Sequence, residues 1–150
     1  MDAADERILQ RLQADGRITN QDLADAAGLS ASACWRRVRA LEEGGVIAGY
    51  AALVDREKAG FATSAILHVS LERHDARFVE EFVRRVSARP EVLDCFATTG
   101  DADYHLRVAV RDMAAYSRFL DEFVFRLPGI RQVRTNVVLK EIKAGVALPF

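Results

Sequence analysis

The stretch TNQDLADAAGLSASACWRRVRALEEGGVI, residues Thr19–Ile47, contains two short amphipathic segments separated by a glycine. Thr19–Ala27 predicts a helix with a Thr-x-x-Asp start, and the glycine that follows ends it. Ser30 can cap a second helix, which Gly44-Gly45 stops because glycine adopts the left-handed turn at a helix end without steric cost. Two helices joined by a glycine turn are the layout of a DNA-reading helix-turn-helix.

The second predicted helix has an apolar side and a basic, outward side. Four apolar residues lie three to five positions apart and predict a stripe that packs on the other helices: Leu29, Cys34, Val38 and Leu41. The outward positions are Ser32, Trp35, Arg36 and Arg39. Guanidinium groups there can pair with phosphates or with guanine, and a serine near the helix start can touch a base edge. The alternative is an ordinary amphipathic helix with a solvated arginine face; the glycine turn and a preceding helix favour DNA binding.

Bulk composition limits the kind of DNA binder that this chain can be. Half of its 150 residues are hydrophobic, enough for one domain or two small ones. The net charge is −1, and residues 1–60 carry 8 Lys and Arg against 10 Asp and Glu, so one basic helix needs several copies to bind firmly. Cys34 and Cys95 lie in apolar settings and are expected to be small buried hydrophobes in a reducing cytosol. Without an apolar signal region or a bilayer-spanning run, we expect a cytoplasmic protein without membrane contact.

The remainder of the first domain follows from simple patterns. Residues 3–14 predict a first helix, and the β-branched stretch Val46–Val54 predicts a strand or wing after the helix-turn-helix. Asp55–Gly60 is charged and ends in glycine, which indicates a domain boundary. We therefore expect a helix-turn-helix domain over residues 1–50 and a connecting strand and linker over residues 51–60.

The second half of the chain repeats one pattern. Pro90 and Pro128 stand 38 positions apart, as do Phe78 and Tyr116. The order strand, helix, strand occurs twice, with expected elements at 65–72, from Asp75, at 92–98, at 104–110, from Met113 and at 130–142. A duplicated β-α-β unit is the ferredoxin-like βαββαβ arrangement, a four-stranded antiparallel sheet with both helices on one face. The predicted fold class is α+β, a winged helix-turn-helix followed by a ferredoxin-like domain over residues 61–150.

Such a sheet leaves one face uncovered by helices. Its expected residues are Ile66, His68, Phe96 or its neighbours, and either Val137 with Leu139 or Val138. A partly aliphatic face is costly to leave in water, so we expect it to meet a second copy of the chain. The resulting dimer would also pair two DNA-reading helices.

The segment between the two repeats, Thr98-Thr99-Gly100-Asp101-Ala102-Asp103-Tyr104, gathers polar groups at one end of the sheet. One interpretation is a hairpin turn with solvated acids, because Gly and Asp are common turn residues. The other is a small-molecule pocket, in which Asp101 or Asp103 accepts from an ammonium group and turn N–H groups hold a carboxylate.

Nearly the whole chain resembles the leucine-responsive regulatory protein (Lrp/AsnC, or feast/famine) family of prokaryotic transcription factors. The matching segments, in order, are 15–20, Leu29-Ser30, Cys34, 37–42, Gly49-Tyr50, 100–104, Asp112-Met113, 127–130 and Arg134-Thr135. The resemblance implies an N-terminal helix-turn-helix and a C-terminal regulatory domain that dimerises and often builds octamers. It also implies an amino-acid effector bound between regulatory domains, which alters assembly or DNA affinity.

The resemblance also carries site residues onto this chain. The DNA-facing positions are Ser30, Ser32, Trp35, Arg36 and Arg39. The effector-binding candidates, which include residues of the turn between the two repeats, are Thr98, Gly100, Asp101, Asp103, Tyr104, Met113, Asn136, Val137 and Val138. Many members have prolines where this chain has Ala31 and Ala33, which loosens the fixed entry into the DNA-reading helix. Members also often have an aromatic residue where this chain has Asn136, and Asn136 indicates a more polar pocket than a leucine site.

Two other functions stay open at this stage. Sirohaem decarboxylases look similar in fold and use histidines, and this chain has His68, His74 and His105. A catalytic base needs a positioned partner, which the sequence does not supply. The other function is an amino-acid sensor whose helix-turn-helix contacts a protein instead of DNA. We expect no enzymatic activity, and no cofactor or metal, because no catalytic set, metal-ligand cluster or phosphate-binding loop is apparent.

Overall fold

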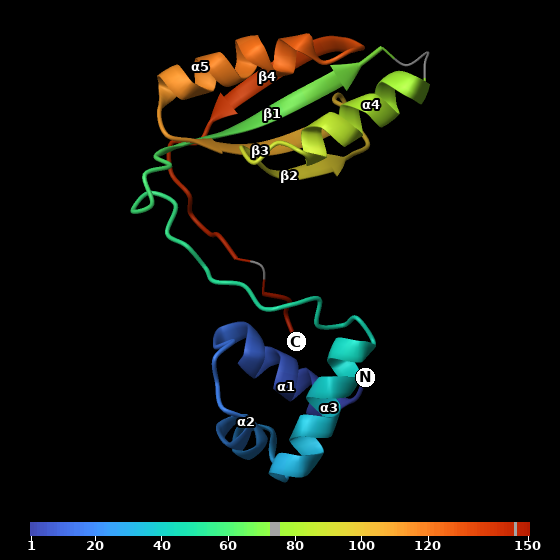
Figure 1. Cartoon of the computed structure of the whole chain (residues 1–150), viewed down its shortest axis with the longest axis vertical. Helices are drawn as coiled ribbons and strands as arrows, with labels where there is room; N and C mark the ends of the chain where they lie inside the picture. Colours follow the sequence, from blue (N-terminus) through green and yellow to red (C-terminus); the bar gives the residue numbers. More distant parts are fainter. Residues whose placement is uncertain (73–75, 146) are drawn as a thin grey trace. The chain divides into compact units, whose positions relative to one another are not determined.

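The computed structural model describes residues 1–72, 76–145 and 147–150. The chain divides into two compact units, Met1–Leu53 with Lys143–Phe150, and Val54–Ile142 (Figure 1). Each unit encloses its own hydrophobic core. Among the described residues, none of the helices has the length and apolar character that crossing a membrane requires.

The first unit is built from three helices, α1 (Ala3–Ala14), α2 (Asn20–Ala27) and α3 (Ala31–Glu43). Each helix begins after a residue whose side chain accepts backbone N–H bonds from the first turn: Asp2, Thr19 and Ser30. Such caps satisfy donors that have no partner within the helix. The predicted starts at Thr19 and Ser30 are confirmed.

Glycine residues end both helices of the predicted motif. Gly28 follows α2 with φ 70°, a left-handed conformation that side-chain-bearing residues rarely adopt. The N–H of Leu29 then donates to the carbonyl of Ala24 at 2.9 Å, which turns the chain into α3. Gly45, with φ 71°, has the same conformation after α3. The predicted glycine turn is therefore confirmed.

The core of the first unit is formed by one side of each helix. Ile8 from α1 and Cys34 from α3 are fully buried, and Leu29 and Val38 pack against this cluster. The predicted apolar stripe of α3 is thus confirmed. At the end of the chain, the side-chain amide of Gln13 donates to the carbonyl of Leu148 at 3.2 Å and accepts from its N–H at 2.6 Å. These two bonds fix the last residues on α1.

The strand predicted over Val46–Val54 is not formed. None of residues 44–62, all of which are described, lies in a strand, and most of them are exposed. A strand needs a neighbour to receive its backbone hydrogen bonds, and the ladders in the described part of this chain all lie within the four-stranded sheet. The β-branched composition of the segment was therefore not sufficient to make it a strand in a single chain.

The second unit is a four-stranded antiparallel sheet with two helices on one face. Its elements are β1 (Thr63–Leu71), α4 (Ala76–Ser87), β2 (Val92–Ala97), β3 (Tyr104–Val110), α5 (Met113–Glu122), the 3₁₀ helix η1 (Val124–Arg126) and β4 (Ile130–Val137). The strand order is β2-β3-β1-β4. The predicted ferredoxin-like arrangement is confirmed, although β4 ends five residues before the expected Ile142. The helix start expected at Asp75 lies outside the described residues, as does His74.

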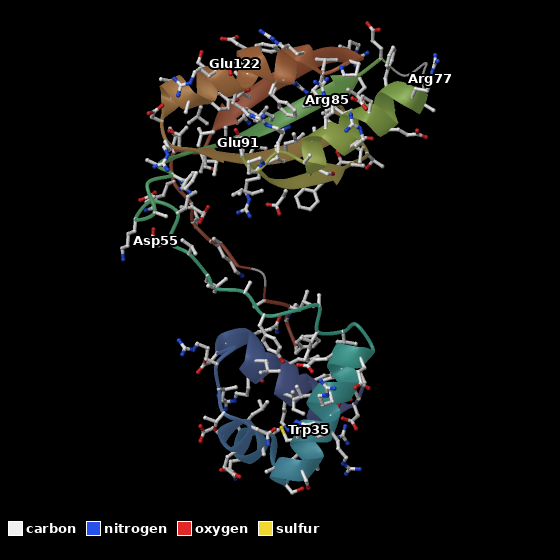
Figure 2. All side chains as sticks on the ribbon, in the orientation of Figure 1. Trp35, Asp55, Arg77, Arg85, Glu91 and Glu122 are labelled. Atoms are coloured by element: carbon white, nitrogen blue, oxygen red, sulfur yellow. The ribbon has the colours of Figure 1, made fainter. Side chains whose placement is uncertain are left out.

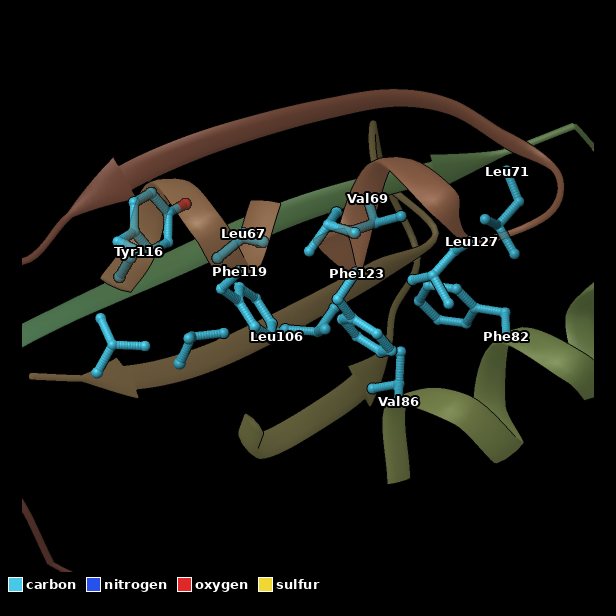
Figure 3. Close-up of a cluster of buried hydrophobic side chains, with 14 residues drawn as sticks. Leu67, Val69, Leu71, Phe82, Val86, Leu106, Tyr116, Phe119, Phe123 and Leu127 are labelled. Atoms are coloured by element: carbon cyan, nitrogen blue, oxygen red, sulfur yellow. The ribbon is translucent and has the colours of Figure 1, made fainter. Parts of the chain in front are cut away.

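Alternation along the strands separates the two faces of the sheet. Leu67 and Val69 of β1 and Leu106 of β3 point to the helices and pack with Phe82 of α4 and Phe119 of α5 (Figure 3). These side chains are buried because both helices cover this face. The sheet and its two helices therefore enclose the core of the second unit.

The opposite, uncovered side is here called the open face. Strand pairing aligns Ile66 with Asn136, and His68 with both His105 and Arg134. Val137 pairs with Ala65 and so lies on the helix-facing side, which leaves Val138 as the open-face candidate of the two predicted alternatives. Exposed Phe96 also pairs with His105 across the β2–β3 ladder. The open face is thus a few apolar side chains among polar and charged ones.

Cys95 contradicts the prediction that both cysteines are buried. It lies on β2 opposite Leu106, yet it is exposed. The physical reason is its position on an edge strand, since β2 has a neighbour on one side only. The apolar residues around Cys95 in the sequence reflected strand propensity and not burial.

Candidate DNA-binding helix and ligand pocket

The outward side of α3 carries the side chains that the sequence singled out. Trp35 is 56% exposed (Figure 2). Ser32, Arg36 and Arg39 are exposed as well. The buried residues of the same helix, Cys34 among them, fix which side faces away from the core. A ring and two guanidinium groups therefore project from one helix of a helix-turn-helix, which is the element that enters a major groove in such motifs.

The three arginines of α3 differ in their partners. Arg37 forms ion pairs with Asp2 at 2.9 Å and Asp5 at 2.8 Å, which hold it to the start of α1. The backbone N–H of Asp5 and this guanidinium lower the pKa of the Asp2 carboxyl. Arg37 therefore joins α3 to α1.

Arg39 and Arg36 are the cations left on the outward side. Arg39 lies 3.7 Å from Glu42 and 3.5 Å from Glu43, and its guanidinium carbon lies 5.8 Å from the centre of the Trp35 ring. Within the part of the chain that the structure describes, Arg36 has no ion pair or hydrogen bond. Arg36 is thus an exposed cation without a counter-charge among the described residues, whereas Arg39 lies beside two carboxylates.

Ser30 has a structural task at the start of α3. Its hydroxyl accepts from the N–H of Ala33 at 3.3 Å and lies 3.3 Å from the hydroxyl of Ser32. The cap defines the first turn of α3 in the absence of the prolines that many family members have there. Ser32 is exposed, and within the described structure its side chain makes no capping bond to the first turn of α3.

The turn between β2 and β3 is fixed by its own hydrogen bonds. The Thr98 N–H donates to the carbonyl of Asp103 at 3.0 Å, and its hydroxyl donates to the carbonyl of Ala102 at 3.3 Å. The two carboxylates of the turn have different surroundings. Asp103 accepts from the backbone N–H of Leu71 at 2.8 Å, whereas Asp101 is exposed.

A hollow of about 430 Å³ lies on the open face beside this turn, and we call it the turn pocket. Its lining residues are His68, Thr99, Asp101, Ala102, His105, Arg134 and Asn136. Opposite charges therefore border one cavity, with the Asp101 carboxylate from the turn and the Arg134 guanidinium from β4. The volume falls within the range of small-molecule sites.

Two histidine rings form part of the wall of the turn pocket. The centres of His68 and His105 lie 4.7 Å apart in an edge-to-face arrangement, and the Asn136 amide nitrogen lies 3.4 Å from Nε2 of His68. Burial lowers the pKa of His68, and the charges of His105 and Arg134 lower it further. A lowered pKa favours the neutral imidazole of His68, which can donate or accept a hydrogen bond.

The structure gathers only some of the predicted effector residues around one cavity. Asp101 and Asn136 line the turn pocket, and Gly100, with φ 121°, shapes the turn beside it. Tyr104 packs on Phe82 on the helix-facing side, with ring centres 4.7 Å apart. Burial raises the pKa of its phenol, which the nearby Cys95 and Asp103 raise further.

The other predicted effector residues lie elsewhere in the second unit. Met113 begins α5, beyond the end of β3 that is distant from the turn. Val137 pairs with Ala65, and the N–H of Val138 donates to the carbonyl of Ser64, both near that same end of the sheet. Within one chain these three residues do not meet Asp101.

Five lining residues were not among the predicted effector residues: His68, Thr99, Ala102, His105 and Arg134. The available signal was strand alternation, because His68, His105 and Arg134 each fall on the open face in the expected strands. From the sequence, His68 was expected on the open face, but His68 and His105 were otherwise considered only as candidate catalytic bases and not as a pair. Among the described residues no group of three or more His, Cys, Asp or Glu could hold a metal ion.

Comparisons with known proteins match both units. Residues 64–148 match the family model described as the Lrp/AsnC ligand binding domain, and residues 1–48 match one described as winged helix-turn-helix DNA-binding. The Bkd operon transcriptional regulator of Pseudomonas aeruginosa is 41% identical over 150 residues, covering 100% of this chain and 98% of the relative. The leucine-responsive regulatory protein of Escherichia coli K12 is 39% identical over 143 residues, covering 95% of this chain and 87% of the relative.

Solved structures of similar regulators also match nearly the whole length of this chain. A transcriptional regulator of Neisseria meningitidis in complex with L-Met has a TM-score of 0.95 at 39% identity, covering 99% of this chain and 96% of that one. An AsnC family regulator from Agrobacterium tumefaciens has a TM-score of 0.95 at 36% identity, covering 99% and 97%. A helix-turn-helix unit joined to a ligand-binding α+β unit defines a ligand-responsive transcriptional regulator. The chain belongs to the Lrp/AsnC family of these regulators.

Proposed function

We propose that this chain regulates transcription by inserting α3 into the major groove of double-stranded DNA, with an amino acid in the turn pocket as its effector. One chain carries both features on which the proposal depends. On the outward side of α3, Arg36 has no partner among the described residues, and in the second unit a pocket is bordered by Asp101 and Arg134. The first feature suits a phosphate or a base edge. The second suits a zwitterion.

The proposed effector contacts follow from charge and chemistry. Asp101 accepts from the ammonium group, and Arg134 holds the carboxylate in a charge-assisted, bidentate pair. Asn136 and His68 supply hydrogen-bonding groups beside them. The Neisseria relative was solved with L-Met, which supports an amino acid as the class of ligand. The polar lining of the pocket favours a short or polar side chain over a large aliphatic one.

We also propose that two chains pair through the open face and that these dimers close into octamers. Ile66 and Phe96 supply apolar contacts on this face. Because the turn pocket opens on the same face, a second copy would enclose an effector between two regulatory units. A dimer presents two α3 helices to one duplex, which multiplies the weak binding of each.

We place this activity in the cytoplasm and propose that the chain catalyses no reaction of its own. Support comes from its relatives, which are regulators. The decisive experiment is a calorimetric titration with each of the twenty amino acids, followed by mobility-shift assays on the chain's own upstream DNA with and without the amino acid that binds. Binding of no amino acid would refute the effector, and the absence of any salt-sensitive shift would refute DNA binding.

A further inference from the structure

A second hollow, of about 280 Å³, lies in the ferredoxin-like unit between α5 and the residues that enter β1. We call it the α5 hollow. It shares no lining residue with the turn pocket. Phe61 and Phe119 contribute aromatic surface, and Val110 and Ala115 contribute aliphatic surface. A cavity of this size admits only a small ligand, and these walls suit one with a compact apolar body.

The charges around the α5 hollow are not balanced. Arg89 and Glu91 form a pair at 2.8 Å, and the Arg89 guanidinium also lies 4.6 Å from the centre of the Phe123 ring. In that pair, Nε of Arg89 and Oε2 of Glu91 are enclosed without a partner in the described structure. These two charges cancel each other and are already committed to the protein.

Arg111, Arg118 and Glu122 are the remaining charges that line the hollow (Figure 2 labels Glu122 on α5). None of the three has an ion pair within the described parts of the chain. Arg111 lies over Phe61, with 5.3 Å between its guanidinium carbon and the ring centre. Two arginines and one carboxylate thus line the hollow beside its apolar walls, which leaves a net positive charge for an anionic ligand.

We propose that the α5 hollow binds a small monocarboxylate with a compact apolar body, and that Arg111 and Arg118 hold its carboxylate. Guanidinium groups bind carboxylates in charge-assisted pairs, which can be bidentate. The apolar body packs between Phe61 and Phe119. Glu122 can accept from an ammonium group where the ligand is an amino acid. This site is additional to the effector site of the turn pocket.

The location gives the ligand access to the segment that connects the two units. Phe61 follows the turn 56–60, and the Arg56 guanidinium donates to its carbonyl. A ligand against Phe61 would therefore add contacts between this segment and α5.

The test uses three probes with the same branched apolar body: 4-methylpentanoate, L-leucine and 3-methylbutylamine. Each is titrated calorimetrically into the full chain carrying Asp101→Ala and Arg134→Ala, so that binding in the turn pocket does not contribute to the heat. We expect 4-methylpentanoate to bind at one site per chain and the amine to give no heat. Binding of L-leucine as well assigns the site to amino acids, and its failure to bind assigns the site to acids without an amine.

Variants then test whether the calorimetric binding signal comes from the α5 hollow. Arg111→Ala with Arg118→Ala should weaken carboxylate binding at least tenfold, whereas Arg84→Ala with Arg131→Ala removes two exposed arginines outside the hollow and should leave it unchanged. Ala115→Leu fills the hollow without altering charge and should have the same effect as the arginine pair, which covers the case that the double variant misfolds. Equal binding of amine and carboxylate, no heat with either carboxylate, or full binding by Ala115→Leu would overturn the proposal. None of these results bears on DNA binding or on the turn pocket.

Discussion

The Asp103 carboxylate accepts a hydrogen bond of 2.8 Å from the backbone N–H of Leu71, the last residue of β1. The N–H of Asp103 in turn donates to the carbonyl of Val69 at 3.0 Å. Side chain and backbone of one residue thus fasten the β2–β3 turn to the neighbouring strand. Asp101, two positions earlier, has an exposed side chain on the wall of the turn pocket. The two aspartates of the turn therefore have separate tasks.

Asp103→Ala should destabilise the fold by about 1–3 kcal/mol, because the part-buried N–H of Leu71 loses its acceptor. Urea unfolding at neutral pH measures the change. Asp101→Ala is the matched control, and its effect on stability should stay within about 0.5 kcal/mol, as for other exposed positions. Equal stability of the two variants would show that the Leu71 bond contributes nothing measurable.

For effector affinity, Asp101→Ala should be the more damaging of the two aspartate variants. Asp101→Ala removes the proposed partner of the ammonium group and should weaken amino-acid binding by about tenfold or more, since charged hydrogen bonds contribute about 1.5–3 kcal/mol. Calorimetry with the amino acid that binds the unaltered chain measures the loss. Arg134→Ala should produce a similar loss through the carboxylate. Full affinity in both variants would exclude the turn pocket as the effector site.

Substitutions of the neighbouring residues Arg36 and Arg37 on α3 should have different effects, one on DNA binding and the other on stability. Arg36→Ala should weaken DNA binding and reduce the slope of log affinity against log salt by about one phosphate contact per chain. Arg37→Ala should instead lower stability, because it leaves Asp2 and Asp5 without their ion-pair partner. Mobility shifts at several salt concentrations, together with thermal unfolding, test both variants. An unchanged salt slope for Arg36→Ala would remove this residue from the interface.

The sequence predicted those features that depend on local chemistry. The caps at Thr19 and Ser30 and the left-handed Gly28 fix the helix-turn-helix, and each is a property of a few adjacent residues. Strand alternation likewise placed the core of the second unit. What the sequence did not reveal depends on residues distant along the chain. The 2.8 Å bond between Asp103 and Leu71 spans 32 positions, and no local pattern distinguishes Asp103 from Asp101.

The missing strand over Val46–Val54 and the exposed Cys95 have a related cause. β-propensity describes how well a residue suits a pleated surface, but a strand forms only where a neighbouring strand is available. Burial likewise depends on what covers a position, and Cys95 lies on an edge strand. The turn pocket is assembled from β1, β3, β4 and the turn together, so it became visible only once the strand register was known.

The open face can be tested as the dimer contact. Ile66→Lys with Phe96→Lys replaces two exposed apolar side chains of the open face by charged ones and should shift the chain towards monomers, because paired copies would bury these charges. Sedimentation velocity over a concentration series measures the shift. Leu53→Lys alters an equally apolar side chain that is 87% exposed and lies in the other unit, so it should leave assembly unchanged. Dimers that persist in the double variant would place the contact elsewhere.

His68 makes the stability of the fold depend on pH in a defined direction. Burial, His105 and Arg134 lower its pKa below the ordinary value of 6.5, so the folded chain takes up this proton less readily than the unfolded chain. Stability from this residue is fully present above about pH 6.5 and declines as the pH falls from there towards the lowered pKa. His68→Gln keeps a polar side chain but cannot titrate, and it should lose less stability between pH 7.5 and 5.5 than the unaltered chain. Urea midpoints measured across that interval decide the matter, and parallel curves for the two proteins would show that protonation of His68 is not coupled to folding.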